Sequence, residues 1–254
     1  MGDVLTGCAV WLTRPAGQAS AWADGLMAAG ARVTIAPLLE IRAPSDADAA
    51  QQGLAEAATA DVVIATSANA VAGARALAPD WAPSGRLIAV GQATAAALTA
   101  FVGTRVEVPQ TSDSEGLLAL LDRTPPTGRR IAILAGEGGR EALADGLVAR
   151  GARVARVALY RRAAVALDTD RLDALLHEHT VLVVTSSAAW QALVSACDSA
   201  RKQRLSGLSL VAPSLRVVQH TDRDIDWQYP PVVIDAMDAA GAQAAVTRAW
   251  LARR

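Results

Sequence analysis

Small polar residues directly follow four apolar runs of strand length in this 254-residue chain. A helix is predicted after each of them, so its free N–H groups and partial positive charge would face a ligand at the strand end. Ser and Thr at a helix start are also common N-caps, each worth about 1 kcal/mol. Capping alone explains any one of these places, whereas four together favour a polyanion held by backbone amides. They are Thr66-Ser67-Ala68-Asn69, Gly91-Gln92-Ala93-Thr94, Gly136-Glu137-Gly138-Gly139-Arg140 and Thr185-Ser186-Ser187.

Two arginines and a tyrosine add side chains that could act on such a ligand. Arg14 follows the first apolar run, and Arg140 follows a later run in the same way. Each could reach an anion at a strand end, although a surface arginine needs no ligand. Tyr160 is one of two tyrosines. Its neutral phenol could donate a proton at cellular pH, or the ring could serve only for packing.

Several other chemistries are excluded by missing patterns. His177 and His179 flank Glu178 at a predicted helix end, and no Cys or Asp cluster completes a metal site. The GEGGR stretch is an incomplete G-x-G-x-x-G, and the chain has neither a Walker A sequence nor a serine nucleophile elbow. Cys8 and Cys197 form no C-x-x-C and are read as small buried residues, with a chance disulfide as the alternative.

The composition indicates a globular protein rather than a membrane or nucleic-acid partner. The chain is 52% hydrophobic with a formal net charge of −1, so it has no basic field for nucleic acid. It contains no apolar run of about 18 residues, which excludes a transmembrane helix. The start MGDVLTGCAVWLTRP lacks the features of a signal peptide, and we expect a cytoplasmic protein.

A repeat nearly half the chain long organises these elements. Residues 23–33 read ADGLMAAGARV and residues 144–154 read ADGLVARGARV, so all but two positions match. Each copy predicts a helix end, a glycine cap at Gly30 or Gly151, and the next strand. The first helix has an apolar face at positions 19, 22, 23, 26 and 27, and the second at positions 143, 144, 147 and 148.

Apolar strands that alternate with amphipathic helices predict parallel sheets covered on both faces. The strands expected after the repeats include DVVIATS, VLVVTS, RLIAV and LSLVA. Segments APLLEIRA and VALYRRAA each follow a repeat strand and are expected to pair as connectors. Two halves built in this way therefore predict two similar α/β domains.

The order of several motifs resembles that of the uroporphyrinogen-III synthase family. The motifs are TRPAGQ, IATSANAV, AVGQATAAAL, DSEGLL, LAGEGGREALADGL and VALYRR. The resemblance implies two flavodoxin-like, three-layer domains with a cleft between them. Residues 1–35 with 164–254 would form one domain and residues 44–155 the other, joined by a two-stranded linker of residues 36–43 and 156–163. It also implies cyclisation of hydroxymethylbilane, a linear tetrapyrrole with eight carboxylates, with loss of water and inversion of ring D, and it implies no cofactor or metal.

The resemblance also assigns roles to residues and partners. Tyr160 and Thr94 are the catalytic candidates. Tyr160 matches the connector tyrosine of the family and would assist departure of the hydroxyl, and Thr94 matches a threonine near the cleft. Substrate binding would fall to the strand-end residues Arg14, Thr66, Ser67, Asn69, Gly91, Gly136, Gly138, Gly139, Arg140, Thr185, Ser186 and Ser187. A monomer with transient contact to porphobilinogen deaminase is expected.

One stretch departs from the family pattern and keeps alternatives open. Residues 211–215 read VAPSL where the family has a Gly-x-x-Thr, and Pro213 removes a backbone donor. Segment 221–231, TDRDIDWQYPP, has no assignment from the sequence. The alternative functions are a non-catalytic tetrapyrrole or polycarboxylate-binding protein of the same fold, and a sensor of the periplasmic-binding type. The lack of a signal peptide and of a DNA-binding segment disfavours the sensor.

Overall fold

The chain divides into two compact units. The computed structural model describes residues 4–138 and 141–254, without the side chain of Ala16. Unit 1 comprises residues up to Glu40 and from Ala163 onward, and unit 2 comprises Ile41–Arg162. Strands β3 (Leu39–Arg42) and β7 (Arg153–Ala164) each cross this division.

Unit 1 has a flavodoxin-like sheet. Within the described residues its five strands lie in the order β2-β1-β8-β9-β10, which is 2-1-3-4-5 in chain order. β1 pairs in parallel with β2 and β8, and β9 pairs in parallel with β8 and β10. The elements are β1 (Ala9–Leu12), α1 (Ala16–Ala28), β2 (Arg32–Ile35), α7 (Thr169–Glu178), β8 (Val181–Val183), α8 (Ser187–Ser195), α9 (Ser199–Ser206), β9 (Ser209–Ala212), α10 (Leu215–Thr221), β10 (Val232–Val233) and α11 (Ala239–Leu251).

Unit 2 repeats four of these strands in a permuted chain order. The order β7-β6-β4-β5 corresponds to β2-β1-β8-β9, but the first two strands in space come last in the chain. Beyond β5, Glu107 forms a parallel bridge to Ile88, at the place of β10 in unit 1. The elements are α2 (Ala47–Ala57), β4 (Val62–Ala65), α3 (Ala68–Leu77), β5 (Arg86–Ala89), α4 (Gln92–Val102), α5 (Ser114–Asp122), β6 (Arg130–Gly136) and α6 (Ala142–Ala149).

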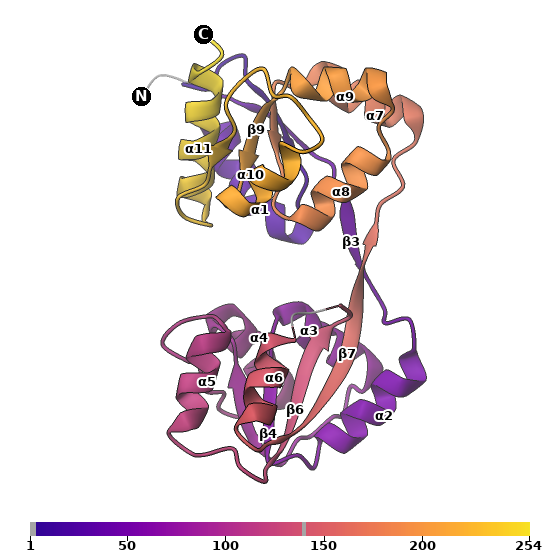
Figure 1. The fold of residues 1–254 in the computed structure, drawn as a ribbon, viewed down its shortest axis with the longest axis vertical. Coiled ribbons are helices and arrows are strands. Elements are labelled where there is room, and N and C mark those ends of the chain that lie inside the picture. Colours follow the sequence, from indigo (N-terminus) through magenta and orange to yellow (C-terminus); the bar gives the residue numbers. More distant parts are fainter. Residues whose placement is uncertain (1–3, 139–140) are drawn as a thin grey trace. The chain divides into compact units, whose positions relative to one another are not determined.

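Each sheet has a hydrophobic core on both faces, which makes each unit a three-layer sandwich (Figure 1). In unit 1, α7 to α10 cover one face, where Trp190 is fully buried, and α1 and α11 cover the other. In unit 2, α2 to α4 cover one face, and α5 and α6 cover the other. Alternate residues of each strand enter opposite cores, as the continuous apolar runs predict.

The two repeats end their helices in the same way. Gly30 has φ +93° and Gly151 has φ +80°, and this left-handed conformation confirms the predicted caps. The predicted apolar faces were too wide, however. Met27 is 50% exposed and Val148 is 57% exposed, although both were assigned to the core side. Both residues occupy the same position of the repeat. They lie at the edge of the apolar helix face, and only the middle of that face packs on the sheet.

The predicted pairing of the two connectors is present, because β3 is the hydrogen-bonded neighbour of β7. Figure 1 shows β7 as one continuous arrow beside β3. The first repeat differs: β2 ends at Ile35, and Pro37 lies in the gap before β3. Proline has no N–H for a ladder, which explains the interruption, whereas Ala158 stands at the matching place within β7.

Candidate functional site

The strand ends of unit 2 enclose a cavity of about 500 Å³. It lies between the carboxyl ends of β4 and β6, where the strand order of the sheet reverses. Open α/β sheets bind ligands at this kind of position. Of the residues that the sequence assigned to the site, the lining includes Thr66, Ser67, Gly136, Gly138 and Tyr160.

Tyr160 is only 5% exposed, and a bulge sets the direction of its side chain. Ala135 on β6 pairs with Ala158, but the next β6 residue, Gly136, pairs with Tyr160. β7 therefore has one extra residue here, and Leu159 and Tyr160 enter the same core instead of opposite faces. Bulges commonly redirect side chains next to active sites.

Gly136 leaves the space that the Tyr160 ring occupies. A Cβ on Gly136 would lie 2.6 Å from Cζ of that ring, which is much closer than two carbon atoms can approach. The ring is buried and rigid, so a side chain at position 136 would have to displace it. Gly136 is thus required by close packing.

The Tyr160 hydroxyl accepts two hydrogen bonds. Ser67 Oγ donates to Tyr160 Oη over 3.2 Å, and Arg162 Nη2 donates over 3.4 Å. The Ser67 oxygen also accepts from the backbone N–H of Ala70, so this serine is the N-cap of α3 as well. With both partners acting as donors, the phenol keeps its own proton for another acceptor.

Charged side chains of both signs line the same cavity. Arg156 and Arg162 line the cavity together with Asp113, Glu115 and Glu137. Asp113 caps α5 through a 2.7 Å bond from Gly116 N, and Arg156 lies 3.8 Å from Glu141. Asp113 and Arg156 therefore already have protein partners.

Glu137 fixes the turn that follows β6. Its carboxylate accepts hydrogen bonds from the backbone N–H and the hydroxyl of Ser45, the latter over 3.0 Å. Its own backbone N–H donates to the carbonyl of Tyr160 over 2.8 Å. Gly138, the next residue, has φ +64°. The turn is thus tied to the strand that carries the tyrosine.

The structure places the other candidates of unit 2 outside the cavity lining. Asn69 lies in the first turn of α3, Gly91 is the N-cap of α4, and Thr94 is buried in α4 with 6% exposure. A Cβ on Gly91 would lie 3.0 Å from Ser112 Oγ, and Ser112 does line the cavity. Gly139 and Arg140 lie outside the described residues.

The remaining candidates belong to the carboxyl edge of the unit 1 sheet. Ser186 caps α8 by accepting from Ala189 N over 3.1 Å, and Thr185 and Ser187 flank it. The Arg14 guanidinium lies over the Trp22 ring, 4.3 Å from its centroid. Burial lowers the pKa of Arg14 from its usual value.

Sequence reasoning missed Arg156 and Arg162. A strand places residues two apart on one face, and Arg162 is two residues beyond Tyr160. That spacing in VALYRR was the available signal. Among the described residues, no group of three or more His, Cys, Asp and Glu side chains could hold a metal ion. Within the same residues, no helix is long and apolar enough to span a membrane.

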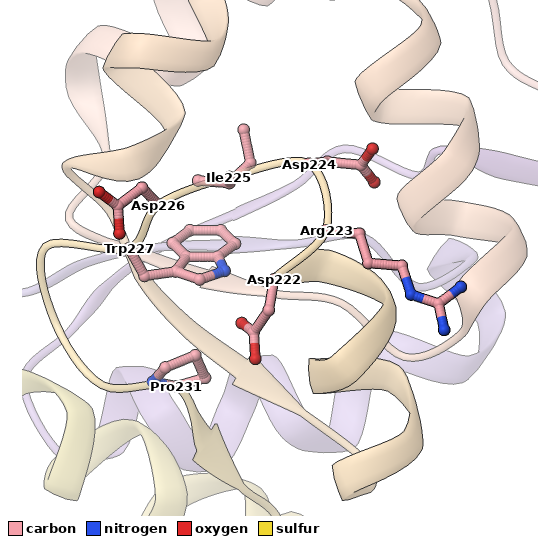
Figure 2. A pocket seen from close by; sticks show the side chains of 7 residues that line it. All are labelled: Asp222, Arg223, Asp224, Ile225, Asp226, Trp227 and Pro231. Atoms are coloured by element: carbon pink, nitrogen blue, oxygen red, sulfur yellow. The ribbon is translucent and has the colours of Figure 1, made fainter.

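A second depression, of about 480 Å³, lies in segment 221–231 of unit 1. Figure 2 shows the Trp227 ring inside the loop, with Arg223 extending away from it. This loop precedes β10, so it lies at the amino edge of the sheet, whereas open α/β sheets bind ligands at the carboxyl edge. It therefore does not belong to the predicted kind of site.

The same segment covers a buried tryptophan. Trp190 Nε1 donates to Asp224 Oδ2 over 2.8 Å, and the Trp190 and Trp227 ring centroids are 5.6 Å apart. Ile225 is buried in the same core. Packing over α8 thus explains the segment that the sequence left unassigned.

The protein consists of two flavodoxin-like units, and one of them has a tyrosine and arginines at its strand ends. It is therefore a two-unit α/β protein with a polar strand-end cavity. The family model for Uroporphyrinogen-III synthase HemD matches residues 20–224. The chain belongs to the uroporphyrinogen-III synthase family.

Curated relatives and solved structures carry the same family name. The uroporphyrinogen-III synthase of Salmonella typhimurium is 34% identical over 227 residues, which cover 86% of this chain and 92% of the relative. That of Synechococcus elongatus is 35% identical over 191 residues, 72% of each chain. A mutant Thermus thermophilus structure covers 96% of this chain and 99% of its own, with 19% identity and a TM-score of 0.63. The Helicobacter pylori structure covers 97% and 99%, with 15% identity and a TM-score of 0.61.

Proposed function

We propose that this chain is a lyase that cyclises hydroxymethylbilane to uroporphyrinogen III, with inversion of ring D and loss of water. Family membership supports the reaction, and relatives at 34% and 35% identity carry the name of this enzyme. The observation that carries the proposal within this chain is the buried Tyr160, whose hydroxyl reaches the strand-end cavity with two donors already bound to it.

In the first step, Tyr160 would donate its proton to the departing hydroxyl of the substrate. The pyrrole nitrogen supplies the electron pair that breaks the C–O bond, so water leaves, and an azafulvenium cation, which keeps its N–H proton, and a phenolate remain. The substituted carbon of ring D then attacks the methylene carbon and gives a spiro intermediate. That intermediate fragments and recloses, and the proton released as the last pyrrole regains aromaticity returns to Tyr160.

Most of the rate advantage would come from holding the linear substrate in a folded conformation. Direct closure of the linear substrate gives the type I isomer, so the protein must favour attack by the substituted carbon. We propose that the strand ends of unit 2 bind the substrate carboxylates. Thr66 and Ser67 would do so after β4, and Gly136 and Gly138 after β6. Arg14, Thr185, Ser186 and Ser187 would bind carboxylates in unit 1.

We also propose that Asn69 and Gly91 bind the substrate and that Thr94 takes part in catalysis. Gly139 and Arg140, which lie outside the described residues, are proposed to bind the substrate as well. The chain would work as a monomer in the cytoplasm. Because the substrate closes spontaneously, transient contact with porphobilinogen deaminase, which supplies it, would limit loss to the type I isomer.

A coupled assay tests the proposal. Porphobilinogen deaminase supplies hydroxymethylbilane, and the oxidised products are separated by chromatography to score the isomers. Type III product that depends on this protein is expected. Type I alone, from folded protein, would contradict the enzyme. A titration with the substrate would then ask whether the chain only binds tetrapyrroles.

Tyr160→Phe tests the proton donor, with Tyr229→Phe as the matched control. Tyr229 is the other tyrosine of the chain, and it lies at the amino edge of unit 1 against Arg253. Tyr160→Phe should lower kcat by about a hundredfold, within the usual range for a general acid, and Tyr229→Phe should not. Unchanged turnover in Tyr160→Phe would remove Tyr160 as the acid.

A further inference from the structure

We infer that Arg162 is a positioning residue that acts through Tyr160: it holds the phenol and stabilises the phenolate left after proton transfer. The inference rests on the proposed function, because it needs Tyr160 as the proton donor. It assigns to Arg162 a role in catalysis that differs from binding a substrate carboxylate, the obvious use of an arginine in this cavity.

The geometry around the phenol supports this role. Arg162 Nη2 lies 3.4 Å from Tyr160 Oη, and the guanidinium carbon lies 5.9 Å from the centroid of the ring. Ser67 holds the same oxygen from α3, and Gly136 packs against the ring. The ring therefore has little freedom, and the guanidinium approaches the one atom whose charge changes in the reaction.

A tight contact holds α3, which carries Ser67, against the strand of the tyrosine. A Cβ on Gly73 would lie 2.2 Å from the carbonyl oxygen of Leu159, so the helix and β7 touch through their backbones. The distance between Ser67 and Tyr160 is thereby set by backbone packing. Arg162 is the third support and the only one of these contacts that brings a positive charge.

The charge has a chemical consequence. A tyrosine that gives up its proton becomes an anion, and a cation within hydrogen-bond distance favours that anion. Arginine stays protonated and only donates, so it cannot take the proton from the phenol. A hydroxyl such as Ser67 can hold the phenolate oxygen but cannot compensate its charge.

Neighbouring arginines make the comparison specific. Arg161 is next in sequence but does not line the cavity. Arg156 lines the cavity on the same strand, and lies within 3.8 Å of Glu141. Arg161→Gln is thus a control for loss of one positive charge at almost the same place in the chain.

The test is a double-mutant cycle on the intact protein with hydroxymethylbilane. We would measure kcat and KM for type III product in Arg162→Gln, Arg162→Lys and Arg161→Gln, and repeat Arg162→Gln in the Tyr160→Phe background. Arg162→Gln should lower kcat roughly tenfold with little change in KM, and Arg162→Lys should restore part of it. Arg161→Gln should leave both kcat and KM at the values of the unchanged chain. In the Tyr160→Phe background, Arg162→Gln should cause no further loss.

Three outcomes would overturn the inference. A rise in KM at constant kcat would make Arg162 a ligand of a substrate carboxylate. Equal loss of kcat with and without the tyrosine hydroxyl would make it independent of Tyr160. Unchanged kinetics would remove it from the site. Failure of the proposed function looks different, because the unchanged chain would then give type I product only, and the inference would fail with it. Thermal unfolding of each variant shows whether it is folded.

Discussion

The two units share a sheet and its capping serines but differ in the chemistry at corresponding strand ends. Ser67 and Ser186 both cap the helix after corresponding strands, with bonds of 3.1 Å in each case. Counting along the repeat, however, Tyr160 of unit 2 stands where unit 1 has Leu39. The serine pair shows that capping maintains the fold in both units. Only unit 2 has a tyrosine at this place, and Tyr160 is the proton donor that we propose.

A second corresponding pair lies after β5 and β9. Thr94 stands five residues after the end of β5, and Val217 stands five residues after the end of β9. Both are buried, with 6% and 3% exposure. Threonine and valine have nearly the same shape, so the units differ here by a hydroxyl and not by packing.

The unusual stretch 211–215 keeps the backbone of its counterpart. Gly91 has φ −164° and ψ 172°, and Ser214 at the matching place has φ −166° and ψ 158°. Both are extended, so the serine fits where unit 2 has glycine. The difference between the two stretches is one backbone hydrogen bond. Val90 donates its N–H to the Ala65 carbonyl over 3.0 Å, whereas Pro213 at the matching place has no N–H to donate.

The largest predicted effect comes from filling the space under the tyrosine. Gly136→Ala should lower kcat by about a hundredfold, because the new Cβ displaces the Tyr160 ring and misplaced catalytic groups cost that much. Gly17→Ala in α1 is the control, since nothing lies within 4 Å of a Cβ there. Steady-state kinetics on both variants would check this. Equal activity in the two would show that the ring position does not matter.

Thr94→Val would give unit 2 the residue that unit 1 already has. Turnover should fall roughly tenfold if the hydroxyl acts on the substrate, while the fold should be retained because the two side chains have nearly the same shape. Thr99→Val changes an exposed threonine of the same helix and serves as the control. Full activity in Thr94→Val would make this position a core residue like Val217.

Removing the capping serines should separate folding from chemistry. Ser67→Ala and Ser186→Ala should each lower the free energy of unfolding by about 1 kcal/mol, measured by denaturant titration. Only Ser67→Ala should also lower kcat, by several fold, because its hydroxyl contacts Tyr160. Ser186→Ala should change KM instead. A fall of kcat in Ser186→Ala alone would reverse the assignment of the two units.

The smallest effect concerns pH, and it belongs to unit 1. His179 is buried, its Nδ1 donates to Leu175 O over 2.8 Å, and its Nε2 has no partner among the described residues. Burial is the main cause that lowers the pKa of His179 from 6.5. The positive charges of Arg32 and Arg171 lower this pKa further, whereas the negative charge of Glu178 raises it. Below pH 6.5 the unfolded chain therefore binds a proton that the folded chain does not, so stability should fall as the pH decreases.

His179→Gln should flatten this dependence, and His177→Gln, which changes an exposed histidine, should retain it. Denaturant titrations between pH 5 and pH 8 would measure both. An unchanged slope in His179→Gln would place the responsible group elsewhere.

The sequence predicted the strands, the helices and the glycine caps because each depends on a local pattern. It also predicted the connector pairing, since both segments follow the same repeat strand. The exposure of Met27 and Val148 was missed because a period of 3.6 residues gives the direction of a helix face but not its width. The bulge at Tyr160 was missed because it comes from pairing with β6, which is far away in the chain.

The arginine beside the phenol shows where such reasoning could have gone further. Strand alternation already relates Arg162 to Tyr160, but the bulge between β6 and β7 decides which side chains meet Ser67. Contacts of this kind depend on the packing of α3 on β7 through Gly73. They require the fold and cannot be read from any single segment.

The placement of the unit boundaries has a consequence for synthesis on the ribosome. Unit 2 is one continuous segment, so it can fold as soon as it emerges. β1 must wait for β8 and β9, which come after the whole of unit 2. At typical elongation rates of about 5–20 residues per second, that delay is roughly ten to forty seconds. During this time Trp11 and Trp22, both buried in the finished protein, have no completed core, and a chaperone that binds exposed apolar segments would find its target at the first forty residues.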